Sequence, residues 1–98
     1  ISDVRLKENI VDANSQWEDI KALRFRNFNW KSDSGLGDGK TYLGLIAQEV
    51  EQILPELVNT GQRGKSVNYS GIIGLLVECV KQQQIEIETL KKSISDHE

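Results

Sequence analysis

Two side chains near the start of the sequence, a serine hydroxyl and a lysine amine, could together perform nucleophilic chemistry. Ser2 and Lys7 lie five residues apart. A serine hydroxyl attacks effectively only when a nearby base removes its proton. The single histidine, His97, is in a segment that we expect to be a frayed tail, so a Ser-His-Asp triad is not expected. Lysine can replace histidine where burial or a nearby cation favours the neutral amine, and Lys7 is the nearest candidate.

The spacing of this pair restricts how the two side chains could meet. On a helix, five residues turn through about 140° and rise about 7.5 Å, so the side chains would face apart. On a strand, an odd offset also places them on opposite faces. Ser2 and Lys7 can therefore meet within one chain only if the backbone turns between them; otherwise Lys7 comes from a neighbouring subunit. By themselves, a serine and a lysine at this spacing are also common among ordinary surface residues.

The other end of the chain carries an apolar pattern with alternating steps of three and four residues, which predicts a coiled-coil helix. The residues of this seam are Ile73, Leu76, Val80, Gln83, Ile87, Leu90 and Ile94. A second stripe of Ile72, Leu75 and Cys79 lies beside the seam in the first turns only. We expect the first half of the helix to contact both the globular part and partner helices, and the second half to contact helices alone. The alternative is one amphipathic helix packed on its own domain.

Between the two ends, the sequence predicts a small α+β unit. The segment 15–18 has the pattern of a capping box that opens a short helix. Strand-like alternation over 23–31 and 41–46 predicts an antiparallel hairpin across a glycine-rich loop, and a slip at Arg26-Asn27 suggests a bulge.

The segments that lead to the long helix are also predicted. Residues 47–54 have the pattern of a helix that Pro55 ends. Residues 59–65 form a polar loop, and 66–69 form a brief extended segment. Asn68 or Ser70 is then expected to cap the long helix.

Composition limits the classes of function that remain. A hydrophobic content of 38% in 98 residues is modest, so we expect burial to depend on neighbouring subunits. The net charge of −3 argues against a nucleic-acid binder, and no apolar run reaches the ~20 residues that span a bilayer. The carboxylates Glu49, Glu51 and Glu56 have no histidine or cysteine near them, so we expect no metal site and no cofactor. The chain begins at Ile1 and has no methionine, so we expect it to be part of a longer protein.

Three segments of the sequence form a recognisable set when they are taken in order. They are Ser2-Asp3-Val4-Arg5-Leu6-Lys7 followed by Glu8-Asn9-Ile10, then Gly44-Leu45-Ile46-Ala47-Gln48-Glu49-Val50, and finally Ser66-Val67-Asn68-Tyr69. Together they resemble the C-terminal intramolecular chaperone, or auto-processing, domains of phage endosialidases, tailspikes and tail fibres. The resemblance extends from about Ser2 to about Lys81.

The resemblance implies that the chain is a serine endopeptidase that cuts itself once. Ser2 would be the nucleophile, Lys7 the base, and Ile1–Ser2 the scissile bond. Asp3, Arg5 and Asn9 match the motif and would order the site or pair across subunits. The family implies a homotrimeric α+β domain, in which residues 1–71 form the globular part and residues 72–98 the trimeric coiled-coil helix.

The function that follows is that of an intramolecular chaperone for a tail fibre or tailspike. It would align three chains, promote their folding and then be released, because a small preassembled trimer raises the effective concentration of the long chains. Its expected partners are two further copies and the N-terminal fibre part of its own chain, with no nucleic acid and no membrane. We expect it in the host cytoplasm during phage assembly, and absent from the mature virion after release.

Two other functions remain as alternatives. The first is a permanent oligomerisation module that never cuts itself. The second is the related auto-processing domain of eukaryotic membrane-anchored transcription factors, which shares the serine and the lysine.

Overall fold

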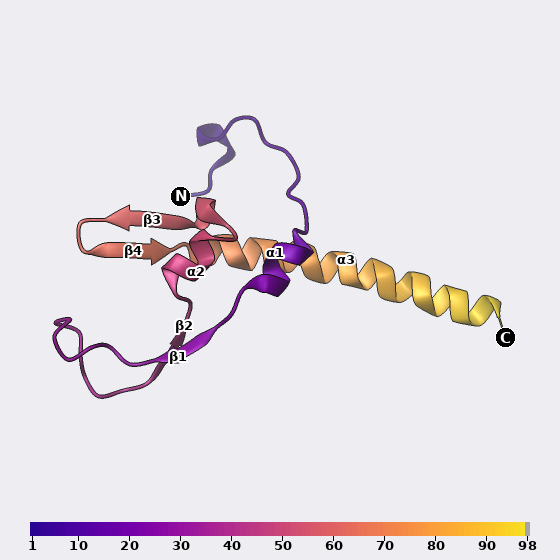
Figure 1. Ribbon diagram of the computed structural model, residues 1–98. Helices are drawn as coiled ribbons and strands as arrows, with labels where there is room; N and C mark the ends of the chain where they lie inside the picture. Colours follow the sequence, from indigo (N-terminus) through magenta and orange to yellow (C-terminus); the bar gives the residue numbers. More distant parts are fainter. Residues whose placement is uncertain (98) are drawn as a thin grey trace.

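A long helix projects from a small group of hairpins and short helices in the computed structural model, which describes residues 1–97 (Figure 1). The molecule measures 63 × 39 × 22 Å along its principal axes. In chain order the elements are the 3₁₀ helix η1 (Val4–Leu6), α1 (Trp17–Ala22), β1 (Arg26–Phe28), β2 (Tyr42–Gly44), α2 (Ala47–Glu51), the 3₁₀ helix η2 (Pro55–Leu57), β3 (Val58–Gly61), β4 (Gly64–Val67) and α3 (Tyr69–Asp96). The predicted α+β class is confirmed.

The first hairpin joins β1 to β2 and confirms the predicted antiparallel pair. Arg26 lies opposite Gly44, and Phe28 lies opposite Tyr42. The pairing is regular through Arg26 and Asn27, so the predicted bulge is wrong. Only the three residues of β1 pair with β2, so the slip in the sequence pattern reflects the short length of the strand. On the hairpin surface, the rings of Phe28 and Trp30 meet edge to face at 5.1 Å.

A second hairpin, β3–β4, occupies the segment that the sequence predicts to be a loop at 59–65. Val58 lies opposite Val67 at its base, and Gly61 lies opposite Gly64 at its tip. The residues between these ends are polar and exposed on both strands, so no apolar alternation indicates a strand. Backbone pairing and the half-buried valines at the base hold the hairpin in place.

The core lies where α2, η2 and the start of α3 meet. Val50 and Leu54 are the most buried side chains, at 1% exposure each, and Leu45, Leu57 and Ile72 complete the cluster. The predicted helix at 47–54 forms but ends at Glu51. Leu54 has φ −133° and ψ 71°, outside the helical region, as expected for a residue that precedes proline.

The short helix α1 forms where the sequence predicts it, but without the predicted capping box. Its N-cap is Gln16, which has a left-handed backbone (φ 46°) and makes no side-chain capping hydrogen bond. The carbonyl oxygen of Ser15 instead accepts a hydrogen bond from the buried Cys79 thiol of α3 at 2.8 Å. Trp17, Cys79 and Gln83 help to line a hollow of about 330 Å³ between the two helices.

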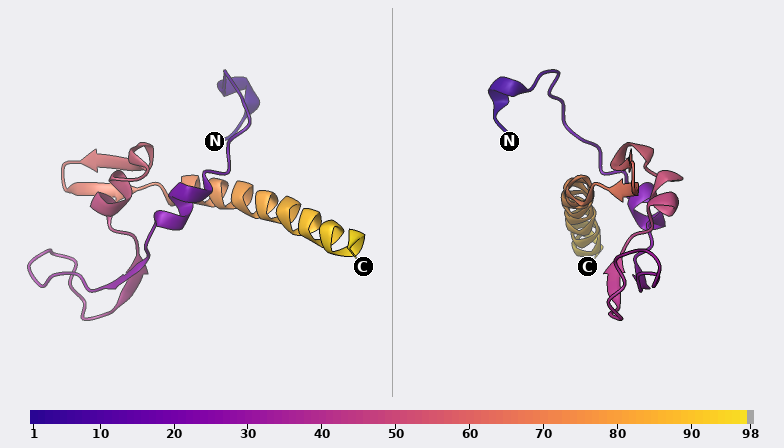
Figure 2. Two further views of the ribbon diagram at one scale, coloured as in Figure 1. Left: turned by 45° about the vertical axis from the view of Figure 1, so that its right-hand side comes forward. Right: turned by 90° about the vertical axis from the view of Figure 1, so that its left-hand side faces the viewer.

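The long helix α3 has 28 residues and begins as predicted, because the Asn68 side chain accepts a hydrogen bond from the Gly71 amide at 3.2 Å. Ile72 and Cys79 of the second stripe are buried against the rest of the domain. The apolar side chains of the seam remain between 44% and 63% exposed. Figure 2 shows the far half of α3 standing clear of every other element. The helix is therefore not an amphipathic helix packed wholly on its own domain.

Two of the three segments that carry the family resemblance, 44–50 and 66–69, meet where α3 begins. The Tyr69 hydroxyl oxygen accepts a hydrogen bond from the Leu45 amide at 2.9 Å. Gly44 leaves room for this contact, because a methyl group there would lie 3.1 Å from the Tyr69 oxygen and equally close to Phe28. The first hairpin is thereby joined to the first turn of the long helix. Within residues 1–97, no helix is long and apolar enough to cross a bilayer.

Replacing each of the two glycines of α3 by alanine should change the stability of the domain in opposite directions. A methyl group on Gly71 would come within 2.5 Å of Leu57 in the core, whereas one on Gly74 would meet nothing within 4 Å. We expect Gly71→Ala to lower the free energy of unfolding by about 1–3 kcal/mol through overpacking. Gly74→Ala should raise it by about 0.5–1 kcal/mol, because alanine loses less backbone entropy in a helix. Denaturant unfolding at one protein concentration measures both, and an equally stabilised Gly71→Ala would contradict the packing of α3 on η2.

Candidate catalytic site

The side chains of Ser2 and Lys7 are in direct contact within one chain. The Lys7 amine (Nζ) donates a hydrogen bond to the Ser2 hydroxyl oxygen (Oγ), with 2.8 Å between the two atoms. Of the two geometries that the spacing allows, a turn within the chain is the one observed.

The turn is formed by the 3₁₀ helix η1. The Leu6 amide donates to the Asp3 carbonyl and the Lys7 amide donates to the Val4 carbonyl, both at 3.1 Å. Lys7 then leaves the helix with an extended backbone (φ −120°, ψ 149°). A 3₁₀ helix has about three residues per turn and is tighter than an α-helix. The chain therefore reverses direction sharply enough for Lys7 to reach back to Ser2.

Asp3 and Arg5 hold this turn together. One Asp3 carboxylate oxygen accepts the Arg5 amide at 2.8 Å and so caps η1, and the other accepts Arg5 Nη2 at 2.7 Å. The hydrogen bonds from the Arg5 side chain, and then from its amide, hold the pKa of Asp3 below its usual value of 3.8. The same ion pair raises the pKa of Arg5. Asn9 follows with a left-handed backbone (φ 53°), a conformation that asparagine tolerates better than most residues.

The segment that carries the pair is open to solvent. Ser2 and Lys7 are exposed, η1 buries none of its residues, and Val4 and Leu6 are 68% and 72% exposed. Figures 1 and 2 show η1 apart from the hairpins and from α3, joined to α1 by an extended linker. The local geometry of a nucleophile and a base is therefore present, but no other element among the described residues excludes water from it.

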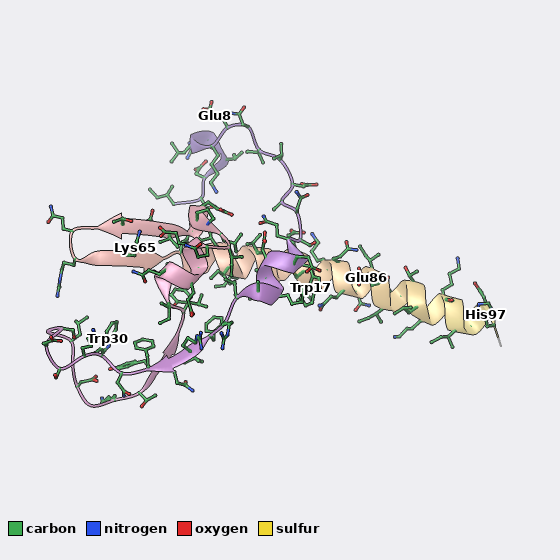
Figure 3. All side chains as sticks on the ribbon, in the orientation of Figure 1. Glu8, Trp17, Trp30, Lys65, Glu86 and His97 are labelled. Carbon is green, nitrogen blue, oxygen red and sulfur yellow. The ribbon has the colours of Figure 1, made fainter. Side chains whose placement is uncertain are left out.

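The other candidate groups lie elsewhere and have structural roles. His97 is at the far end of α3, well away from Glu8, which follows the turn (Figure 3). Glu49 forms a two-point ion pair with Arg26, with atom separations of 2.7 and 3.1 Å, which lowers the pKa of its carboxyl group. Glu51 pairs with Lys65 at 2.9 Å. Within residues 1–97, no three histidine, cysteine or acidic side chains form a group that could hold a metal ion.

Comparison with known proteins identifies the family. Residues 2–59, more than half of the chain, match the family described as the chaperone of endosialidase, peptidase S74. The chain belongs to this family. Membership in this peptidase family implies autoproteolytic activity. The region that matches the chaperone of endosialidase family begins at Ser2, so it contains the whole Ser2–Lys7 turn.

The relatives of this chaperone of endosialidase domain include much longer phage proteins. Long tail fiber protein Gp37 of Escherichia phage AR1 is 34% identical over 87 residues, which is 83% of this chain and 8% of that protein. Long tail fiber protein Gp37 of Salmonella phage S16 is 35% identical over 98 residues, which is 96% of this chain and 13% of that protein. The chain thus spans only a small part of the length of either relative.

The turn predicts that contact between Ser2 and Lys7 depends on the charge of Asp3. Because the pKa of Asp3 is lowered in the folded chain, the carboxylate stabilises the turn above the usual value of 3.8. That stabilisation should be lost as the pH falls through the lower, folded value. Nuclear Overhauser contacts between the Ser2 β protons and the Lys7 ε protons report the turn directly.

Asp3→Ala should remove these contacts at neutral pH, whereas Glu8→Ala, which changes an exposed acid just beyond the turn, should keep them. If the contacts persist in Asp3→Ala, or survive full protonation of Asp3, the carboxylate does not hold the turn.

Proposed function

We propose that this chain is the self-cleaving chaperone domain of a phage tail fibre, and that Ser2 and Lys7 cut the Ile1–Ser2 bond after three copies have assembled. One observation carries the proposal: the 2.8 Å hydrogen bond between Lys7 Nζ and Ser2 Oγ in a chain that belongs to an autoproteolytic family. The similarity to two long tail fiber proteins supports the choice of a tail fibre as the parent.

The chemistry follows from the direction of that hydrogen bond. A lysine amine that donates to a hydroxyl is in position to accept the hydroxyl proton once the amine is neutral. Burial favours the neutral form of an amine, because it penalises the charged form. In the single chain both groups are exposed, so this activation requires a surface that covers the turn.

Neighbouring subunits would supply that surface. The seam of α3 exposes apolar side chains over most of a 28-residue helix. Burying such area is worth about 25 cal/mol per Å², which favours association through the seam. The number of three strands comes from the family resemblance, since isoleucine, leucine and Gln83 in the seam do not determine it.

Assembly and cutting would then be coupled. The exposed Val4 and Leu6 of η1 give a neighbouring subunit an apolar surface to cover, together with the dyad. In a chain that has not assembled, Ser2 and Lys7 would stay exposed to water and the chain would remain uncut. The cut would therefore report that the three chains are in register, which is the task of a folding chaperone.

The two parts of the chain would have different roles in this function. Residues 1–71 would form the processing and chaperone part and residues 72–98 the coiled coil. The partners would be two further copies and the upstream fibre part of the same chain, and the cut would occur in the host cytoplasm during phage assembly. A permanent oligomerisation module is the alternative, and it predicts no released fragment.

Replacing either member of the dyad should block release without preventing assembly. Ser2→Ala removes the attacking oxygen, and Lys7→Ala removes the base. Lys7→Arg should fail equally, because a guanidinium group does not give up its proton at accessible pH. Electrophoresis of the full-length parent measures release, with Lys21→Arg, an exposed lysine of α1 paired with Glu18, as the matched control that should still be cut. Normal release from Lys7→Arg would eliminate Lys7 as the base.

Disrupting the seam should both dissociate the domain and slow its cleavage. Ile87→Asp combined with Leu90→Asp places like charges where apolar contacts are expected, so sedimentation equilibrium should show a trimer converted to a monomer. The matched control, Thr89→Asp with Lys92→Asp, puts the same side chains outside the seam and should stay trimeric. A stable monomer for the unaltered chain would contradict the assembly, and normal cutting by the dissociated variant would contradict the coupling.

A further inference from the structure

We propose that the hollow between α1 and α3 is a contact site for a second copy of the chain. It takes the partner's Gln84, and Glu86 at its rim pairs with the partner's Lys91. This inference rests on the proposed function, because it takes association through the seam of α3 as given. It adds that α1 belongs to the same interface and that this contact sets the register of the helices.

The hollow lies directly beside the seam. Figure 3 shows Trp17 and Glu86 close together where α1 lies against the middle of α3. The hollow measures about 330 Å³, many times the space that one water molecule needs. It is lined by Ser15, Trp17, Cys79, Gln82, Gln83 and Glu86. Because Gln83 is also a residue of the seam, a helix that packs on the seam passes over the mouth of the hollow.

The heptad pattern says which residues of that helix come closest. With the apolar steps of the seam at positions a and d, Val80 is at a and Gln83 is at d. Glu86 then lies at position g, and Lys91 lies at position e of the following heptad. In a parallel coiled coil that is in register, a residue at g faces the residue at e of the next heptad in the neighbouring helix. Glu86 of each copy is therefore placed opposite the partner's Lys91.

The charges of these two positions are complementary. Within residues 1–97, neither Glu86 nor Lys91 forms an ion pair with another side chain. Glu78 and Lys81, which lie outside positions e and g of the same helix, pair with each other at 3.3 Å. An antiparallel neighbour would bring g to g and e to e, which would leave Glu86 and Lys91 apart. The charge pattern thus favours a parallel partner.

The chemistry of the hollow suits a glutamine side chain. The g position of the preceding heptad is the buried Cys79, and the residue that faces it is the partner's Gln84. Trp17 gives the hollow an apolar wall for the stem of that side chain, and the glutamines of the lining offer amide groups for its amide. In the single chain Gln84 donates a hydrogen bond to Glu88 at 3.1 Å. Both groups are exposed, so water can replace this bond at little cost.

This contact gives the coiled coil a fixed register. The apolar residues of a seam repeat, so slipping by one heptad keeps much of the apolar contact. The hollow does not repeat, because α1 lies against α3 at one level only. A slip of one heptad would remove the partner's Lys91 from Glu86 and the partner's Gln84 from the hollow. In a domain whose proposed task is to align three chains, α1 thereby marks the correct alignment.

A mixture of two charge variants tests the ion pair. Glu86→Lys alone and Lys91→Glu alone place like charges at every contact, so each should dissociate at roughly tenfold higher concentration than the unaltered chain. When the two are unfolded together and refolded, contacts between unlike chains restore opposite charges. Native mass spectrometry, with one variant tagged, should show more mixed trimers than random exchange gives.

The matched control exchanges charges of the same helix outside positions e and g. Glu88→Lys and Lys92→Glu change the same residue types at positions b and f, so they should mix at random. Random mixing of the Glu86→Lys and Lys91→Glu chains would overturn the ion pair. An equal excess of mixed trimers in the control pair would show that position does not matter, and would overturn it too.

Tryptophan fluorescence tests the hollow independently. Trp17 is 43% exposed in the single chain, and in Trp30→Phe it is the only tryptophan. Its emission should lie at shorter wavelengths in the trimer than in the seam variant Ile87→Asp with Leu90→Asp, because a partner covers it. Gln84→Ala should leave Trp17 in the trimer more accessible to acrylamide.

The outcomes separate this inference from the proposed function. A trimer in which Trp17 emits as it does in the seam variant would place α1 outside the interface. That result would overturn the inference while the proposed assembly stands. A chain that stays monomeric at every concentration would contradict the proposed function itself.

Discussion

The structure depends on one constraint: the chain has too little core to cover its own apolar surface. Its buried cluster is small and lies only where α2, η2 and the first turn of α3 meet. The hairpins extend from this point in one direction and α3 in the other (Figure 1). The apolar side chains that remain exposed include those of the seam of α3 and Val4 and Leu6 of η1. Small domains commonly gain the missing burial by association.

The same constraint separates the geometry of the candidate site from its activation. The Ser2–Lys7 contact is made entirely by neighbours in sequence, through two backbone hydrogen bonds and the Asp3–Arg5 pair. It can therefore form in a single chain. Exclusion of water is a long-range property, which a segment standing apart from its own domain cannot provide for itself. Under the proposed function, a reaction that requires a neutral lysine would thereby be tied to assembly.

Sequence reasoning succeeds where a local pattern and the tertiary structure agree. The first hairpin, the Asn68 cap and the length of α3 all follow from turn residues, capping chemistry and apolar periodicity. It fails where the decisive contact is distant or carries no side-chain pattern. The polar strands of β3 and β4 show no alternation, and just before α1 the Ser15 carbonyl accepts a hydrogen bond from Cys79, which is 64 residues away in the sequence.

The candidate site is an intermediate case. The residue types of Ser2 and Lys7 could be identified from the sequence, but regular helix or strand geometry would place them apart. The missing information is the 3₁₀ turn. One signal for it was present: aspartate is a favoured capping residue, and Asp3 lies two positions before the amide that it binds. Under the proposed function, the burial that would activate Lys7 would come from other copies of the chain, and the sequence pattern does not indicate which of their residues would cover the turn.

The central claim is that assembly of this domain leads to a single cut before Ser2. The most direct measurement is intact-mass analysis, with N-terminal sequencing, of the small fragment that accumulates when the full-length parent assembles. We expect one fragment, with a free amine on Ser2, that elutes as a trimer on size-exclusion chromatography. Fully assembled parent that yields no fragment, or a fragment that begins at any other residue, would contradict it.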